Sequence, residues 1–141
     1  MSKIAVVYWS STGNTEKMAK TITESAKNSG ADVDEFFVDE FNADLVSNYD
    51  KIAFGCPAMG NDELEETSFE PVFTECEKVL GKKPIAIFGS YEWYEGGWIE
   101  NWEDRCRASG LNLAFDPIKA YDYPDDEALE NCKKLGEELA K

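Results

Sequence analysis

The sequence contains no histidine, and its four cysteines lie far apart. Histidine is the commonest metal ligand and the side chain that ordinarily titrates near neutral pH, so its absence argues against a metal site. No C-x-x-C pair is present to form a metal or dithiol site. We therefore predict no metal site and expect reduced, structural thiols at Cys56, Cys76, Cys106 and Cys132.

Basic residues are also scarce, with 14 Lys and Arg against 29 Asp and Glu and a net charge of −15. Nucleic acids and anionic membranes bind basic patches, so both are excluded as natural partners. A protein partner with a basic docking surface fits this charge. Acidity would also serve simply to keep a small protein soluble, and composition alone favours neither explanation.

Long hydrophobic runs are missing. Only a short apolar run follows the N-terminal residues before polar residues begin, which predicts neither a signal peptide nor a membrane span. We therefore expect a cytoplasmic protein. A chain of 141 residues with 43% apolar residues can fill one core, so we expect a single domain over residues 1–141 and a monomer.

Short apolar runs alternate with segments of helical period. We expect strands at residues 4–8, 33–38, 51–55 and 85–90 and a broken strand at 113–120. We expect helices at residues 14–28, 43–47, 69–80, 98–108 and 126–140, three of them ended by Gly30, Gly81 and Gly110. This β-α order predicts a three-layer, doubly wound α/β fold with a parallel sheet, whose ligands bind beyond the carboxyl ends of the strands.

The loop after the first predicted strand has the composition of an anion cradle. Four hydroxyls and one amide are offered as donors by Ser10, Ser11, Thr12, Thr15 and Asn14. The turn through Gly13 also exposes backbone N–H groups at the positive end of a helix. Because the loop contains no Lys or Arg, it suits a phosphate dianion that stays tightly bound. The alternative is an ordinary Ser/Thr-rich turn that caps a helix.

Other phosphate-binding motifs are missing. Neither G-x-x-x-x-G-K-[ST] nor a G-x-G-x-x-G after the first strand is present, which argues against a P-loop nucleotidase and a dinucleotide site. The first loop lacks the Cys and Arg of a phosphotyrosine phosphatase. A response-regulator receiver would need acidic residues where Trp9-Ser10 and Cys56-Pro57 stand.

Three segments resemble the flavin-binding loops of the flavodoxins, most closely the short-chain flavodoxins of anaerobic bacteria. They are VYWSSTGNTE at residues 7–16, GCPAMG at 55–60 and FGSYEW at 88–93. The resemblance implies a five-stranded sheet in the order 2-1-3-4-5 and one non-covalent FMN. It also implies a carrier of single electrons, in which the flavin supplies the chemistry and cycles chiefly between its one- and two-electron reduced forms.

The resemblance assigns the FMN phosphate to the loop from Ser10 to Thr15. Positions that contact the ribityl chain or lie beside it match Ala58, Ser90 and Asp122. Trp93 has a flat face suited to stack on the outer side of the isoalloxazine, and Met59 suits the inner side. Asp62 stands where relatives often have a longer acidic side chain that accepts a hydrogen bond from flavin N3. The other candidate contacts in these loops are Pro57, Gly60, Asn61, Tyr91 and Glu92.

Two further features of these loops predict how the flavin is tuned. Gly60 and Asn61 read as the centre of a tight turn, since both tolerate positive φ. Acidic residues also crowd the loops, and a negative field disfavours the anionic, fully reduced flavin. The carboxylates expected to rim the cofactor are Asp62, Glu63, Glu65, Glu66, Glu92, Glu95 and Asp122.

The sequence thus predicts a low-potential, one-electron carrier that shuttles electrons between redox enzymes. The alternative is a small FMN-dependent reductase that acts on its own substrate. The chain leaves no residues for a nicotinamide-binding domain, and no acid or base with a His-like pKa occurs near the loops. Trp98 and Trp102 lie four residues apart on one helix face, which favours core packing over a role with the flavin.

Overall fold

The computed structural model describes residues 2–59, 63–92 and 96–141. Its strands form one parallel sheet in the order β2-β1-β3-β4-β5. β6 pairs with the last residues of β4, which follow those that pair with β5. The strands are β1 (Lys3–Tyr8), β2 (Asp32–Phe37), β3 (Lys51–Gly55), β4 (Pro84–Tyr91), β5 (Asn112–Leu113) and β6 (Ile118–Tyr121). The predicted order 2-1-3-4-5 is confirmed.

The fifth position in the sheet is filled by two short strands. β5 pairs with Pro84 and Ile85 at the start of β4, and β6 pairs with the stretch from Phe88 to Tyr91 at its end. The residues between β5 and β6 include Pro117, which has no N–H to give to a ladder. This explains why the strand predicted at 113–120 is interrupted.

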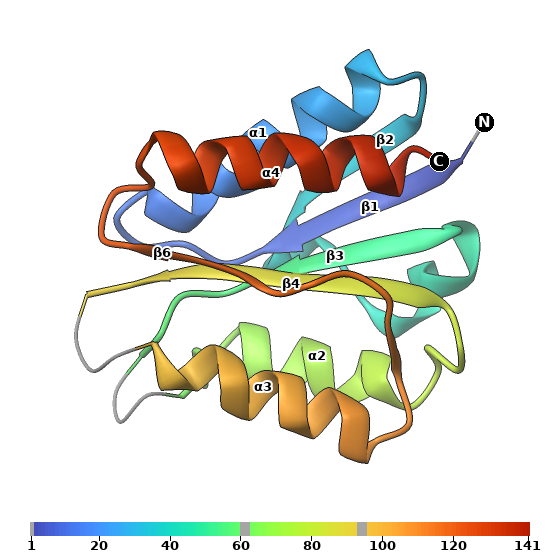
Figure 1. Cartoon of the computed structure of the whole chain (residues 1–141). Coiled ribbons are helices and arrows are strands. Elements are labelled where there is room, and N and C mark those ends of the chain that lie inside the picture. Colours follow the sequence, from blue (N-terminus) through green and yellow to red (C-terminus); the bar gives the residue numbers. More distant parts are fainter. Residues whose placement is uncertain (1, 60–62, 93–95) are drawn as a thin grey trace.

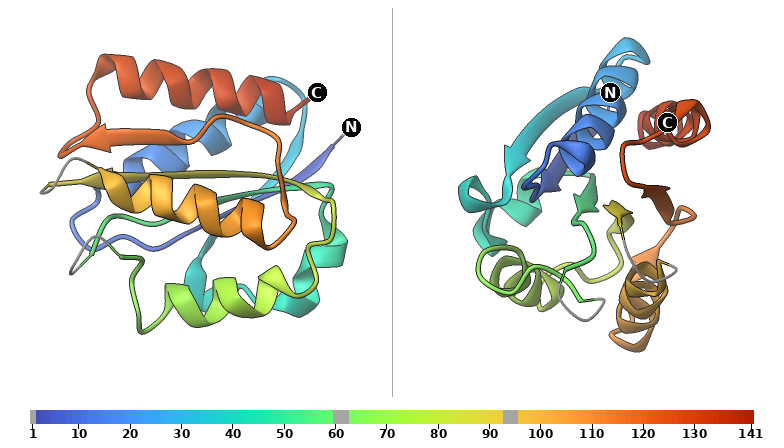
Figure 2. Two further views of the ribbon diagram at one scale, coloured as in Figure 1. Left: turned by 60° about the horizontal axis from the view of Figure 1, so that its bottom comes forward. Right: turned by 90° about the vertical axis from the view of Figure 1, so that its left-hand side faces the viewer.

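Helices cover both faces of the sheet (Figures 1 and 2). α1 (Asn14–Asn28) and α4 (Asp126–Leu139) lie together on one face, and α2 (Phe69–Glu77) and α3 (Gly97–Ala108) lie on the other. Two 3-10 helices, η1 (Val38–Glu40) and η2 (Ala43–Asn48), connect β2 to β3. The predicted helix at 43–47 is therefore a 3-10 helix, and α2 ends at Glu77, three residues before the predicted boundary.

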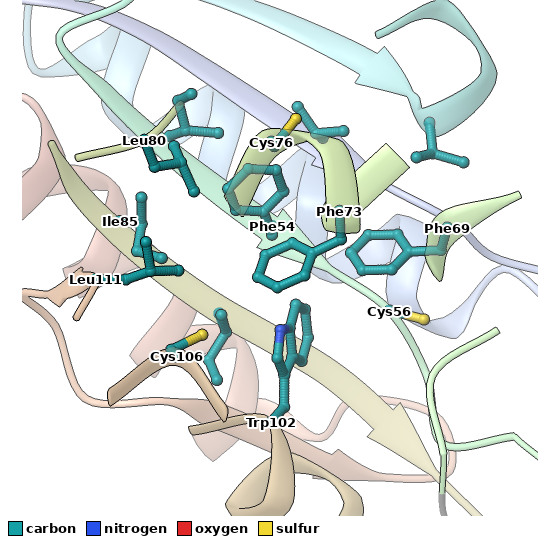
Figure 3. Packing of buried hydrophobic residues seen from close by; sticks show 14 of the residues in the cluster. Phe54, Cys56, Phe69, Phe73, Cys76, Leu80, Ile85, Trp102, Cys106 and Leu111 are labelled. Atoms are coloured by element: carbon teal, nitrogen blue, oxygen red, sulfur yellow. The ribbon is translucent and has the colours of Figure 1, made fainter. Parts of the chain in front are cut away.

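The core beneath α2 and α3 contains a group of aromatic rings packed among aliphatic side chains and cysteines (Figure 3). The Phe54 ring meets Phe73 edge-on at 5.1 Å between centroids. The indole of Trp102 packs edge-on against Phe69 and Phe73 at 5.4 and 5.6 Å. Trp102 and Trp98 are both 1% exposed, which confirms the prediction that they pack in the core.

All four cysteines are free and buried, as expected of structural thiols. Burial raises the pKa of Cys76, Cys106 and Cys132 to about 12, and that of Cys56 still further, because a thiolate is poorly solvated inside the protein. No group of three or more His, Cys, Asp or Glu within the described ranges could hold a metal ion.

On the opposite face of the sheet, α1 and α4 approach each other closely at Gly136 of α4. A Cβ placed on this glycine would lie 2.6 Å from the Ser25 Cβ and 2.7 Å from the Ile22 carbonyl oxygen of α1. The Ser25 hydroxyl donates to the Lys133 carbonyl oxygen at 2.6 Å.

Among the described residues, none of the helices is long and apolar enough to cross a membrane.

Candidate cofactor site

The described residues just after β1, β3 and β6 lie beside one another and beside the end of β4, at the carboxyl edge of the sheet, on the left in Figure 1. Backbone hydrogen bonds extend the sheet into these residues. Trp9 N–H donates to Gly55 O at 3.0 Å, and Ala58 N–H donates to Ser90 O at 3.0 Å. The segment after β6 joins through Asp122 N–H, which donates to Tyr91 O at 2.7 Å. The predicted meeting of the strand-end loops is therefore present.

The first loop leaves the N-terminus of α1 open. Gly13 occupies the cap position with a φ of 97°, a conformation that suits glycine, and its N–H donates to Ser10 Oγ at 3.1 Å. No side chain of the described residues accepts from the first-turn N–H groups. The Ser11 and Thr12 side chains are exposed. Gly13 itself has no side-chain cap bond, so the hydroxyls and backbone N–H groups of this loop are grouped at the positive end of α1, as the anion-cradle prediction requires.

The carboxylate that follows this loop already has partners within the protein. Glu16, in the first turn of α1, accepts from the Tyr8 hydroxyl at 3.3 Å and lies 3.9 Å from Lys20 Nζ. Burial and the carboxylates of Glu16 and Glu35 raise the pKa of Tyr8 to about 12, so this phenol stays a neutral donor. An anion in the loop would accordingly be bound by neutral donors and the helix dipole.

A buried pair of hydroxyls connects the first loop to the third. Thr15 and Ser90 are 1% and 5% exposed, and their hydroxyl oxygens lie 2.9 Å apart. The Ser90 N–H also donates to Thr15 Oγ1 at 3.3 Å. Two hydroxyl protons share this arrangement and one suffices for the mutual bond, so the other can point to a ligand.

Asp122 lies between the first loop and the end of β4. Its carboxylate accepts from Asn14 Nδ2 at 3.4 Å, while its N–H bonds to Tyr91 O. Its φ is 54°, the only positive φ among the non-glycine residues that the structure describes. Aspartate tolerates this left-handed conformation better than most residues, and such strain is typical of functional sites.

The second loop is supported from beneath. The Trp98 indole N–H donates to Cys56 O at 3.1 Å. A Cβ at Gly89 would lie only 2.1 Å from the same oxygen, so β4 requires glycine at this point. Pro57 and Met59 are half-buried and Ala58 is buried. These contacts place the loop directly over the end of β4.

Met59 and Glu63 pair across the ends of the predicted turn. Met59 N–H donates to Glu63 O at 2.7 Å, and Glu63 N–H donates to Met59 O at 2.8 Å. The candidates Gly60, Asn61 and Asp62 lie outside the described residues.

The third loop begins with a packed aromatic residue. The Tyr91 ring lies 5.6 Å from Trp98 and 5.3 Å from Tyr121, and Lys119 Nζ lies 5.9 Å from its centroid. Glu92 is exposed. The stacking candidate Trp93 lies outside the described residues, as does Glu95.

Glu65 was expected on the acidic rim, but it is turned into the protein and only 7% exposed. Its Oε1 accepts from the N–H groups of Ser68 and Phe69 at 2.7 and 2.8 Å, and its Oε2 accepts from Thr67 N–H at 2.9 Å. Burial alone would raise the pKa of this carboxyl, but these hydrogen bonds outweigh burial and hold the pKa below its ordinary value. The Glu65 carboxylate therefore caps the N-terminus of α2 from a position before Ser68, the N-cap residue. Its position just before a helix is the one sequence signal that could have revealed this role.

Known proteins that are similar to this chain agree with the resemblance seen in the loops. The family model described as flavodoxin matches residues 6–136. The flavodoxin of Megasphaera elsdenii is 41% identical over 138 residues, which cover 98% of this chain and 98% of that protein. The flavodoxin of Clostridium beijerinckii is 40% identical over 135 residues, covering 96% and 97%.

Solved structures show the same fold. The solution structure of two-electron reduced Megasphaera elsdenii flavodoxin matches with a TM-score of 0.84 and 40% identity, covering 97% of this chain and 98% of that one. A flavodoxin from the domain Archaea matches with a TM-score of 0.83 and 28% identity, covering 98% and 96%. The chain therefore belongs to the flavodoxin family, and it is an electron-transfer protein that binds FMN rather than an enzyme that turns over a substrate.

Proposed function

We propose that the strand-end loops hold the FMN with its phosphate on the N-terminus of α1. The observation that carries this proposal is the first turn of α1, where Gly13 provides no side-chain cap and the exposed hydroxyls of Ser11 and Thr12 lie beside the helix N-terminus. Neutral donors and a helix dipole suit a phosphate that is retained. The same loop is bonded to Ser90 and Asp122, so one ligand can touch all of these segments.

The proposed contacts divide by the part of the cofactor that they meet. Those for the phosphate are Ser10, Ser11, Thr12, Gly13, Asn14 and Thr15. Those for the ribityl chain and the ring are Pro57, Ala58, Met59, Gly60, Asn61, Asp62, Ser90, Tyr91, Glu92, Trp93 and Asp122. Trp93 and Met59 would cover the two faces of the ring and exclude water.

The bound flavin supplies the one-electron chemistry. The chain's own residues bind, orient and tune it. The Thr15–Ser90 and Asn14–Asp122 hydrogen bonds hold the loops in register. Carboxylates near the loops raise the energy of an added negative charge, which supports a low-potential couple.

We extend the proposal to the protein's setting. It is a single-domain, cytoplasmic monomer that exchanges electrons with redox partner proteins through their basic docking surfaces. The support for the basic partners and the monomer is the net charge of −15, which attracts basic proteins and repels copies of the same chain. The support for one domain is a single sheet, with α1 and α4 packed together on one of its faces.

Ligand binding tests the proposed site. The double variant Ser11→Ala/Thr12→Ala removes two exposed hydroxyls from the phosphate loop, and each hydrogen bond to a charged group is worth about 1.5 to 3 kcal/mol. We expect FMN affinity to fall by at least ~100-fold and riboflavin affinity to change little, since riboflavin lacks the phosphate. Thr21→Ala, which removes a hydroxyl bonded to Lys17 O, is the matched control and should leave both affinities unchanged.

Three results would contradict the proposal. Equal losses of FMN and riboflavin would show that the loop does not meet the phosphate. A purified protein that is colourless and cannot take up FMN would refute the site as a whole. Rapid intrinsic oxidation of NAD(P)H would favour the reductase alternative over a carrier.

A further inference from the structure

We propose that Tyr121 and Tyr123 form the contact point at which a basic redox partner docks. The inference rests on the proposed function, since it names where the partner binds relative to the cofactor loops. Large hydrophobic side chains are exposed at only three of the described positions: Val79, Tyr121 and Tyr123, at 53%, 64% and 60%. Two of the three flank Asp122, which is bonded to the first loop. Exposed aromatic surface is thus concentrated beside the cofactor site.

The ring of Tyr121 is held in place before any partner arrives. It meets Tyr91 edge-on, with 5.3 Å between centroids and 72° between planes. Tyr91 in turn packs 5.6 Å from the buried ring of Trp98. A tyrosine held in this way offers contact area at little cost in side-chain entropy, which is why tyrosine is enriched at binding hot spots.

The charge around the two tyrosines identifies the partner's chemistry. The segment from Tyr121 to Ala128 contains Asp122, Asp125, Asp126 and Glu127 and no Lys or Arg. Two residues before Tyr121 on β6, Lys119 is paired with Glu100 at 3.7 Å. Lysine and arginine side chains can pair with such carboxylates and lie over tyrosine rings. The surface therefore fits a patch that is rich in Lys and Arg.

A second copy of this chain is a poor occupant. It would bring a net charge of −15 and the same carboxylates against this surface, and like charges that meet at an interface disfavour association. A small aromatic contact ringed by steering charges is instead typical of weak, transient electron-transfer encounters.

The test measures electron transfer from the fully reduced protein to cytochrome c, a basic haem protein, by stopped flow at several ionic strengths. The variant Tyr121→Ser/Tyr123→Ser should lower the second-order rate constant about tenfold, and the ratio should persist at high salt because the lost contact is not ionic. Asp126→Asn/Glu127→Gln should slow transfer at low salt only, because salt screens steering charges. Tyr121→Phe/Tyr123→Phe keeps the rings and should retain the parent rate.

Val79→Ser is the matched control. It removes an equally exposed side chain, but Val79 follows the C-terminal end of α2. Because α2 runs back from the carboxyl edge of the sheet, this residue lies at the opposite end from the cofactor loops. It should leave the rate unchanged.

Other outcomes overturn the inference. A tyrosine double variant that transfers electrons at the parent rate at every ionic strength shows that the rings do not touch the partner. A variant that loses FMN affinity assigns the tyrosines to the cofactor site instead, and one that dissociates a dimer seen by light scattering assigns them to a second copy. If the parent protein takes up no FMN, the proposed function fails, and this result is distinct from all of these.

Discussion

Glu65→Gln is expected to destabilise the protein although it changes only one atom. With the new amide oxygen at the Oε1 position, the side chain would still accept from the N–H groups of Ser68 and Phe69. The new amide nitrogen would then face the Thr67 N–H, donor against donor. One hydrogen bond to a charged acceptor is lost, which is worth about 1.5 to 3 kcal/mol. Glu65→Ala removes all three bonds, and we expect it to cost more than Glu65→Gln.

The effect of Glu65→Gln should depend on pH. The folded protein holds the pKa of Glu65 below its ordinary value of 4.5, so the carboxylate's contribution to stability is fully present above pH 4.5. It is lost as pH falls through the lowered pKa of the folded state. The difference between parent and variant should therefore be constant near neutral pH and shrink in acid below pH 4.5.

Urea unfolding at a fixed excess of FMN, repeated across pH, measures this difference. Glu66→Gln neutralises the adjacent, exposed glutamate and is the control, with an expected change within about 0.5 kcal/mol. Equal stabilities of the two variants, or a pH-independent difference, would refute the capping role of Glu65.

Four further substitutions each test a different feature of the molecule. Thr15→Val keeps the shape but leaves the buried partner groups of Ser90 unpaired, so unfolding should show a loss of about 1 to 3 kcal/mol. Gly136→Ala gains ~1 kcal/mol in helix propensity, yet its Cβ would overlap α1, so thermal unfolding should show a net loss of about 1 to 2 kcal/mol and a raised Tm would contradict the packing. Glu66→Gln should raise the potential of the second one-electron reduction, by at most ~70 mV for a charge ~10 Å away, and by less at high salt. Gly60→Ala should lower the potential of the first one-electron reduction, because alanine penalises the positive φ expected at this turn by ~1 to 2 kcal/mol. Unchanged potentials together with lost FMN affinity would show that the turn is only structural.

Sequence patterns predicted the parts of this fold that depend on local composition. The apolar runs of β1, β3 and β4 reflect burial on both faces of the sheet, and this requirement leaves a continuous signal. α1 begins and ends as predicted, because Gly13 and Gly30 both adopt the positive φ that marks a helix boundary. The broken run near Pro117 was visible, but its division into two strands depended on pairing with β4.

Contacts between distant segments could not be predicted in this way. Nothing local relates Asn14 to Asp122 or Trp98 to Cys56 O, because each pair meets only through the order of the strands. The prediction that Glu65 lies on the acidic rim is wrong for a related reason. The charge of Glu65 predicted an exposed side chain, whereas its actual environment depends on where α2 begins.

The hydrogen bond between Asn14 and Asp122 spans 108 positions in the chain. Its partners come together only when β1, β4 and β6 have all taken their places in the sheet. A growing chain on the ribosome therefore cannot form the complete cofactor site until the segment through Asp122 has emerged. At the proposed site, FMN binding would therefore report that folding has reached the last strand of the sheet, β6.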